Sequence, residues 1–201
     1  MKKAVIYIHG KGGSIDEANH YKKILNDDYE VIGFNYKSEL PWQAKVEFQK
    51  YFDFIIPKYD EILLIENSIG AYFSMLSLSE KLIKRAIFIS PVVNMENVIL
   101  NRMKWANVSE EELKAKKVIN AFFGEPLSWE YLSYVRNNPI TWNTPTSILY
   151  GRKDNITSFK VMDNFANKIN ADLTILDNGE HWVHTNEQMK FLDNWFKKMI
   201  E

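Results

Sequence analysis

Ser68 is the side chain whose setting in this sequence most suggests chemistry. An apolar run over residues 63–65 leads into this serine, and Gly70 follows two residues after it. Residues 71–76 then have the composition of a buried helix. A sharp turn from strand to helix holds a serine hydroxyl clear of the sheet, where a base can reach it. The pattern therefore predicts a nucleophilic serine of the kind used in acyl transfer.

A histidine is needed as base, because a serine hydroxyl is a weak nucleophile at its ordinary pKa. His181 is the best placed of the four, since it follows a tight turn at Gly179 after the last predicted strand. His184, one helical turn later, is the alternative base. We expect His9 to brace a glycine-rich loop and His20 to lie exposed on the first helix.

A carboxylate must in turn orient the base. Asp154 is our first candidate, because it lies in the loop after the fifth predicted strand. Its alternative role is that of a turn residue or helix cap, which is common for aspartate. Glu96, after the fourth strand, is the second candidate acid. Asp177 is the third, because it is too close to His181 along the chain to reach behind it easily.

The loop of residues 9–14, His-Gly-Lys-Gly-Gly-Ser, predicts a place where backbone N–H groups approach a ligand. In a serine hydrolase, the backbone N–H groups of Lys11 and Ile69 would form the oxyanion hole. A phosphate-binding loop is the competing interpretation. It is disfavoured because neither glycine-rich phosphate motif has the required spacing here.

Six short apolar segments must position these groups, and helical segments separate them. We predict strands over residues 4–8, 29–36, 61–66, 85–90, 146–150 and 172–176. Such alternation favours an α/β three-layer sandwich, a mainly parallel sheet with helices on both faces. Functional groups gather at the carboxyl ends of parallel strands, so the loops named above should share one edge.

The alternation breaks over residues 92–142, where we expect no strand and predict helices over residues 113–122 and 129–135. Many aromatic side chains fall in this segment. We predict a cap whose Trp105, Phe122 and Trp129, together with Trp182 beside the base, contact substrate. The alternative is that these aromatic residues only pack the helices onto the sheet.

Composition limits the remaining possibilities. The 201 residues suit one domain, with a core over 1–91 and 143–201 and the cap inserted between them. A net charge of −1 favours neither nucleic acid nor an anionic membrane, and no apolar run approaches a membrane span. The absence of cysteine excludes disulfides and zinc–thiolate sites. We expect a cytoplasmic protein with a small-molecule acyl substrate and neither metal nor cofactor; the oligomeric state stays open.

These motifs together resemble the α/β-hydrolase superfamily over essentially the whole chain. Residues 66–70 correspond to its nucleophile elbow and residues 9–13 to its oxyanion loop. The order Ser68, Asp154, His181 is the family's order of nucleophile, acid and base. The resemblance implies a compact serine hydrolase whose sheet lacks the family's first two strands, and a cap over residues 92–142.

Glu66 departs from the family pattern, which prefers a small residue at this position of the elbow. We expect this glutamate to brace the elbow, with tuning of His181 or a hydrogen bond to the cap as alternatives. We predict that the chain hydrolyses small to medium acyl esters. The alternatives are a hydrolase-like binding protein with little turnover, or a thioesterase, amidase or peptidase on the same fold.

Overall fold

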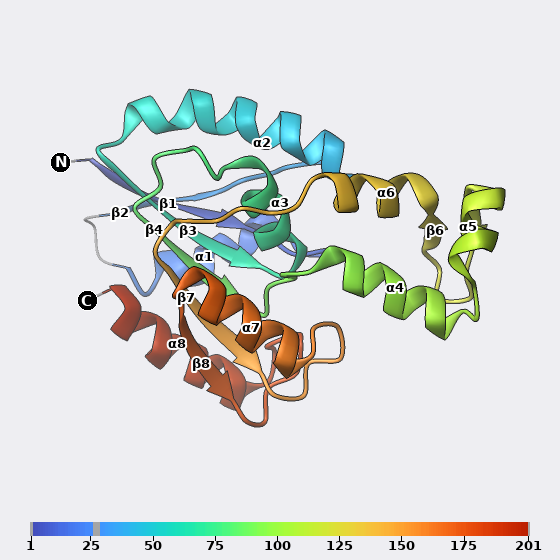
Figure 1. Cartoon of the computed structure of the whole chain (residues 1–201). Coiled ribbons are helices and arrows are strands. Elements are labelled where there is room, and N and C mark those ends of the chain that lie inside the picture. Colours follow the sequence, from blue (N-terminus) through green and yellow to red (C-terminus); the bar gives the residue numbers. More distant parts are fainter. Residues whose placement is uncertain (1, 26–28, 201) are drawn as a thin grey trace.

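The computed structural model describes residues 2–25 and 29–200, in which six strands form one parallel sheet (Figure 1). The strand order is β2-β1-β3-β4-β7-β8. Their bounds are β1 Lys3–Ile8, β2 Tyr29–Gly33, β3 Glu61–Asn67, β4 Arg85–Ile89, β7 Thr146–Gly151 and β8 Asp172–Leu176. All six predicted strands are confirmed, although β2 ends three residues early. The ends of the predicted domain, residues 1 and 201, lie outside the described residues.

Helices cover both faces of this sheet, because alternate strand residues point to opposite sides. Ile6 and Leu64 pack on one face with α2 (Pro41–Ile55), α3 (Ile69–Ser77) and α7 (Phe159–Ile169). Their neighbours Val5 and Leu63 pack on the other face with α1 (Ala18–Lys22) and α8 (Asn186–Ile200). The predicted three-layer α/β sandwich is therefore confirmed.

Two short 3₁₀ helices lie outside the core: η1 (Ile15–Glu17) leads into α1, and η2 (Ile56–Lys58) follows α2. Among the described residues, none of the helices combines the length and hydrophobicity that crossing a bilayer requires.

The insertion contains both helices and strands. Its elements are α4 Met95–Trp105, α5 Glu110–Lys116, β5 Val118–Asn120, β6 Pro126–Ser128 and α6 Trp129–Asn137. The predicted helix over residues 113–122 is wrong beyond Lys116, because Lys117 has φ 67° and ends the helix. The expectation of no strand is also wrong: β5 and β6 pair antiparallel across a turn with Gly124 at φ 82°.

We call residues 92–142 the cap. It projects beyond the carboxyl ends of the strands, with α5 farthest from the sheet (Figure 1). Helix α6 anchors it by packing against α2 and α4. Tyr134 meets Trp42 of α2 edge-on at 5.4 Å between ring centroids, and Arg136 bonds Glu96 of α4 at 2.6 Å. The cap is thus an ordered projection that α6 holds against α2 and α4.

Candidate active site

Ser68 occupies a strained turn between β3 and α3. Its φ of 51° and ψ of −117° lie in a region that non-glycine residues rarely adopt. Gly70 makes the turn possible, because a Cβ at this position would lie 2.6 Å from the carbonyl oxygen of His9. The elbow is therefore pressed against the end of β1, and the serine is held at the carboxyl edge of the sheet.

The three predicted catalytic side chains form one hydrogen-bonded chain. The Ser68 hydroxyl lies 2.8 Å from Nε2 of His181, and Nδ1 of His181 lies 2.7 Å from Oδ2 of Asp154. With a proton on Nδ1 donated to the carboxylate, Nε2 is free to accept the proton of the serine. This arrangement can abstract a proton from Ser68 and hold the resulting imidazolium beside a negative charge.

The Asp154 carboxylate is fixed by its own loop. Its side chain is fully buried, and Oδ1 accepts backbone hydrogen bonds from Ile156 at 2.7 Å and Thr157 at 3.0 Å. The buried charge is thereby paired and hydrogen-bonded, as burial of a carboxylate requires. Oδ2 remains available to accept the hydrogen bond from Nδ1 of His181, and this bond fixes the orientation of the imidazole ring.

Close backbone contact brings the acid loop and the base loop together. A Cβ at Gly151 would lie 2.4 Å from the carbonyl oxygen of Glu180, so only glycine fits there. The Lys153 N–H donates to the carbonyl of Gly179 at 2.8 Å. These contacts explain how the loop after β8 returns across the end of β7 and delivers His181 to Asp154.

The other histidines have different partners. His184 stacks on Trp182 with ring centroids 4.3 Å apart, and His9 stacks on Tyr36 at the same separation. His20 is bonded to Asp193 at 2.6 Å. None of these rings is the partner of Ser68, so the structure selects His181 from the candidates geometrically.

The alternative acids are likewise engaged elsewhere. Glu96 pairs with Arg136 inside the cap, and Asp177 bonds Nε of Arg152 at 2.6 Å. Only Asp154 meets the imidazole of His181. No three metal-ligating side chains converge anywhere in the described ranges.

The predicted oxyanion loop is held beside the elbow. Gly10 lies so close to Ser68 that a Cβ would come within 3.1 Å of the serine Cβ. The Tyr36 hydroxyl donates to the carbonyl of His9 at 2.9 Å. Ile69 is the first residue of α3, where backbone N–H groups have no helical partner. Ile69 directly follows the serine and Lys11 follows Gly10, so the oxyanion hole formed by their backbone N–H groups stays a prediction.

Glu66 lies beneath this elbow without a hydrogen bond. The side chain is fully buried, and neither carboxyl oxygen has a partner among the described residues. Burial raises the pKa of this carboxyl well above its usual range, and the Ser74 hydroxyl on α3 opposes the rise only weakly. Glu66 and Ser74 do not meet the geometry of a hydrogen bond. Burial therefore favours the neutral acid over the carboxylate at this position.

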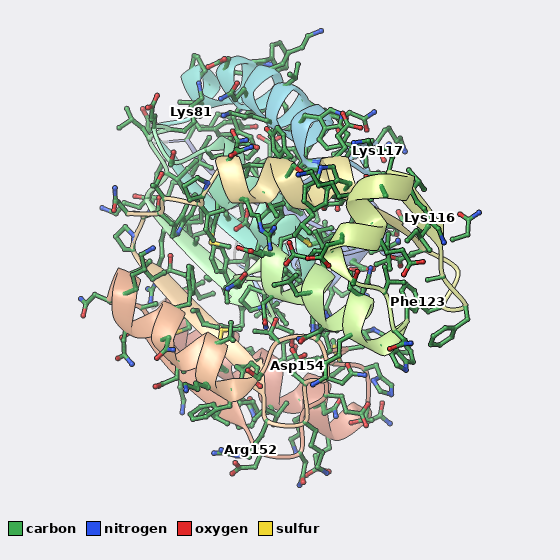
Figure 2. The ribbon with its side chains drawn as sticks, turned by 45° about the vertical axis from the view of Figure 1, so that its right-hand side comes forward. Lys81, Lys116, Lys117, Phe123, Arg152 and Asp154 are labelled. Atoms are coloured by element: carbon green, nitrogen blue, oxygen red, sulfur yellow. The ribbon has the colours of Figure 1, made fainter. Side chains whose placement is uncertain are left out.

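A cavity of about 620 Å³ opens beside Ser68 and His181. Trp182 lines it with 72% of its surface exposed, and its contact with substrate stays a prediction. Trp105, Phe122 and Trp129 are not among the described residues that line it. Trp105 and Phe122 instead form an exposed aromatic cluster with Phe123, which projects at the outer edge of the cap (Figure 2).

Three residues that sequence reasoning missed connect the elbow with the oxyanion loop. Nδ2 of Asn67 donates to the Tyr7 hydroxyl at 2.6 Å, and this hydroxyl donates to Glu17. Glu17 also accepts the backbone N–H of Ser14 at 3.2 Å. Burial, and then the bond to Glu17, raises the pKa of Tyr7 far above its usual range. A sequence signal for part of this network is the capping-box spacing, in which Glu17 follows Ser14 by three residues.

No protein-family model matches the sequence, and comparison with curated proteins found no match. Solved structures, however, are similar over nearly the whole chain. α/β-Hydrolase domain-containing protein 10 from mouse has 16% identity and a TM-score of 0.76, with 98% of this chain and 89% of that chain covered. Est1E from Butyrivibrio proteoclasticus has 16% identity and a TM-score of 0.76, with 99% and 86% covered.

A third similar structure is the esterase PF2001 of Pyrococcus furiosus. It has 20% identity and a TM-score of 0.60, with 99% of this chain and 80% of that chain covered. At such identities the likeness concerns the fold. These three structures, together with the parallel sheet described above, show that the chain has the α/β-hydrolase fold.

Proposed function

We propose that this protein of the α/β-hydrolase fold is a serine hydrolase that cleaves small to medium carboxylic esters. The observation that carries the proposal is the continuous chain from Ser68 through His181 to Asp154, with contacts of 2.8 and 2.7 Å. Nucleophile, base and acid in hydrogen-bond contact are the combination that acyl transfer needs.

In the proposed reaction, the Ser68 oxygen attacks the ester carbonyl while Nε2 of His181 takes the hydroxyl proton. A tetrahedral intermediate forms, and its oxyanion accepts hydrogen bonds from the backbone N–H groups of Lys11 and Ile69. The C–O bond to the alcohol then breaks as His181 returns the proton to the leaving oxygen. One oxyanion-hole donor is typically worth about 10²–10³ in kcat.

Water completes the cycle by attacking the acyl-enzyme, with His181 again acting as base and then as acid. Asp154 keeps its charge throughout and stabilises the imidazolium that forms in both halves. Since Asp154 is buried and accepts two backbone hydrogen bonds, little reorganisation is needed when that cation appears.

The proposed substrate class follows from the size of the cavity and from the similar proteins. A volume of about 620 Å³ suits a small organic molecule. One similar protein is named an esterase, and Est1E has a structure with ferulic acid, a carboxylic acid, bound. Both points favour an ester of a carboxylic acid over larger substrates.

Hydrolysis of p-nitrophenyl acetate, butyrate and octanoate tests the proposal. The wild-type protein should release p-nitrophenol, and Ser68→Ala should reduce kcat to the background rate. Ser90→Ala is the matched control, because Ser90 is a second serine with positive φ, 45°, directly after the neighbouring strand β4, and it is buried. Equal hydrolysis by the wild-type and Ser68→Ala proteins would refute the proposal and leave the binding-protein alternative.

A further inference from the structure

The cavity beside Ser68 extends toward α1 and α8 rather than under the cap. Ser68 and His181 line it together with Tyr7, Glu17 and Tyr21, which form its wall toward α1. Of the described residues that line it, none comes from residues 92–142. A substrate held by the proposed triad would therefore place one of its two ends against this wall.

Glu17 gives this wall a fixed negative charge. One of its carboxylate oxygens accepts the Ser14 N–H at 3.2 Å, and the other accepts the hydroxyl proton of Tyr7. A carboxylate offers about four acceptor positions, so the group retains the capacity to bind a further donor. Because both oxygens are already held in place, little side-chain entropy is lost when a ligand binds.

Aromatic side chains line the same cavity as this carboxylate. The rings of Tyr7 and Tyr21 lie 5.4 Å apart and are buried, whereas the ring of Trp182 is 72% exposed and stacks on His184. Aromatic faces attract cations, and a nearby carboxylate adds Coulombic attraction. This combination recognises an ammonium group better than a neutral group of the same shape.

The basic side chains at the cavity have carboxylate partners of their own. Lys11 is paired with Glu125 of the cap at 2.7 Å, and His20 with Asp193 at 2.6 Å. Glu17 is the only carboxylate among the described lining residues, and its two hydrogen bonds come from uncharged donors. Its charge is therefore left for a ligand.

We propose that this cavity is a subsite for a substrate group that carries an ammonium charge, and that Glu17 is its specificity-determining residue. The substrate class rests on the proposed ester hydrolysis, since Ser68 lines the same cavity and would act on the ester bond. The subsite itself depends only on the cavity wall, so binding and hydrolysis can be tested separately.

Binding is measured on Ser68→Ala, which cannot turn over. Choline and 3,3-dimethylbutanol have the same shape and differ in charge. Each is titrated while the indole N–H signal of Trp182 is followed by NMR. We expect choline to bind at least about tenfold more tightly, and added salt to reduce this preference because it screens charge. Equal affinities of the two ligands would overturn the subsite.

Specificity is measured with two isosteric p-nitrophenyl esters, 4-(trimethylammonio)butanoate and 5,5-dimethylhexanoate. Wild type should prefer the cation by about tenfold in kcat/KM. Glu17→Gln retains an acceptor for the bond from Tyr7 and should bring the ratio close to one. Asp16→Asn is the control, because it removes one charge from the neighbouring residue, which does not line the cavity.

The outcomes separate the two proposals. Preference for choline without hydrolysis of either ester would leave the subsite standing and refute the serine hydrolase. Hydrolysis of both esters at equal rates, with the ratio unchanged in Glu17→Gln, would overturn the cationic subsite and leave the hydrolase standing. If the preference for the cationic ester fell equally in Asp16→Asn and Glu17→Gln, the subsite proposal would also be contradicted. The charge of Glu17 would then have no special role.

Discussion

Two regions border Ser68, and they differ in how they are tied to it. On the α1 side, Asn67, Tyr7 and Glu17 form a hydrogen-bonded network that joins the elbow to the oxyanion loop. On the cap side, the link to that loop is the pair of Lys11 with Glu125, which also meets Arg102. The first network is buried at Tyr7, half-buried at Asn67 and exposed at Glu17, whereas the second is an ion pair near the surface.

This difference affects how strongly each region can fix the groups around Ser68. Exposed ion pairs contribute about 0–1 kcal/mol, whereas breaking a buried hydrogen bond leaves a desolvated group unpaired at a cost of about 1–3 kcal/mol. We therefore expect the α1 side to fix the elbow and the loop of residues 9–14 more firmly than the cap side does. The aromatic richness of the cap, by contrast, reflects its own packing and an exposed cluster. Four variants test this contrast.

The largest effect on kcat should come from replacing Asp154, the proposed acid, and the comparison is with Glu96, a carboxylate of the cap. Asp154→Asn keeps the shape but favours the wrong tautomer of His181, and should lower kcat about 10³–10⁴-fold. Glu96→Gln, which loses only its pair with Arg136, should stay within about twofold. Steady-state ester hydrolysis measures both. If Asp154→Asn retained full activity while Glu96→Gln lost it, the acid would be misassigned.

Glu66→Gln should change how stability depends on pH. Because burial raises the pKa of this acid, the folded state keeps the proton to a higher pH than the unfolded chain, which loses it above about pH 4.3. The folded state then binds more protons, so this group makes stability fall as pH rises, by about 1.4 kcal/mol per pH unit until the folded pKa is reached.

Glutamine cannot ionise, so Glu66→Gln should lose that decline and be the more stable protein at pH 8. Urea unfolding at pH 5 to 8 measures the difference from wild type, and other titrating groups cancel in this comparison. Glu17→Gln is the control, because Glu17 is an exposed carboxylate near the elbow. Its free energy of unfolding should still fall with rising pH as in wild type. Parallel curves for wild type and Glu66→Gln would show that Glu66 is not held neutral.

Tyr7→Phe should lower kcat about tenfold with KM within about twofold. The ring still fills the core, but the hydroxyl that links Asn67 to Glu17 is gone, so the elbow and the oxyanion loop lose their connection. Tyr72→Phe is the matched control, because its buried hydroxyl has no partner among the described residues. Equal losses in the two variants would indicate a general effect of buried tyrosines.

The smallest effect is expected in the cap. Trp105 is 66% exposed and does not line the cavity, so Trp105→Ala should change kcat/KM for p-nitrophenyl butyrate by less than about twofold. Trp182→Ala, at the cavity wall, should lower it several-fold. A larger loss in Trp105→Ala than in Trp182→Ala would restore the cap as the substrate wall.

Much of the fold could be predicted from the sequence, because each strand is a short apolar run bounded by turn residues. The order of the loops after those strands also pointed to Ser68, Asp154 and His181 as neighbours. The cap was harder. Residues 118–120 look like the end of a helix, and their strand pairing depends on a partner at residues 126–128 that has no apolar alternation.

The network around Tyr7 could not be predicted, because its members come from three separate segments that only tertiary structure brings together. Tyr7 is one apolar-looking residue in a buried strand, and Glu17 looked like an ordinary cap residue. Aromatic composition suggested the cap as substrate wall, but composition does not reveal which side chains border a cavity. The orientation of each side chain and its distance from the cavity determine which residues line it.

Labelling with a fluorophosphonate tests the central claim most directly, because such probes react with serines that a base has activated. Intact mass and peptide mapping should show one adduct on Ser68 of the folded wild type, none on Ser90, and much slower labelling in His181→Ala. A folded wild-type protein that takes up no probe, or labels equally fast without His181, would contradict the assignment of Ser68 as an activated nucleophile.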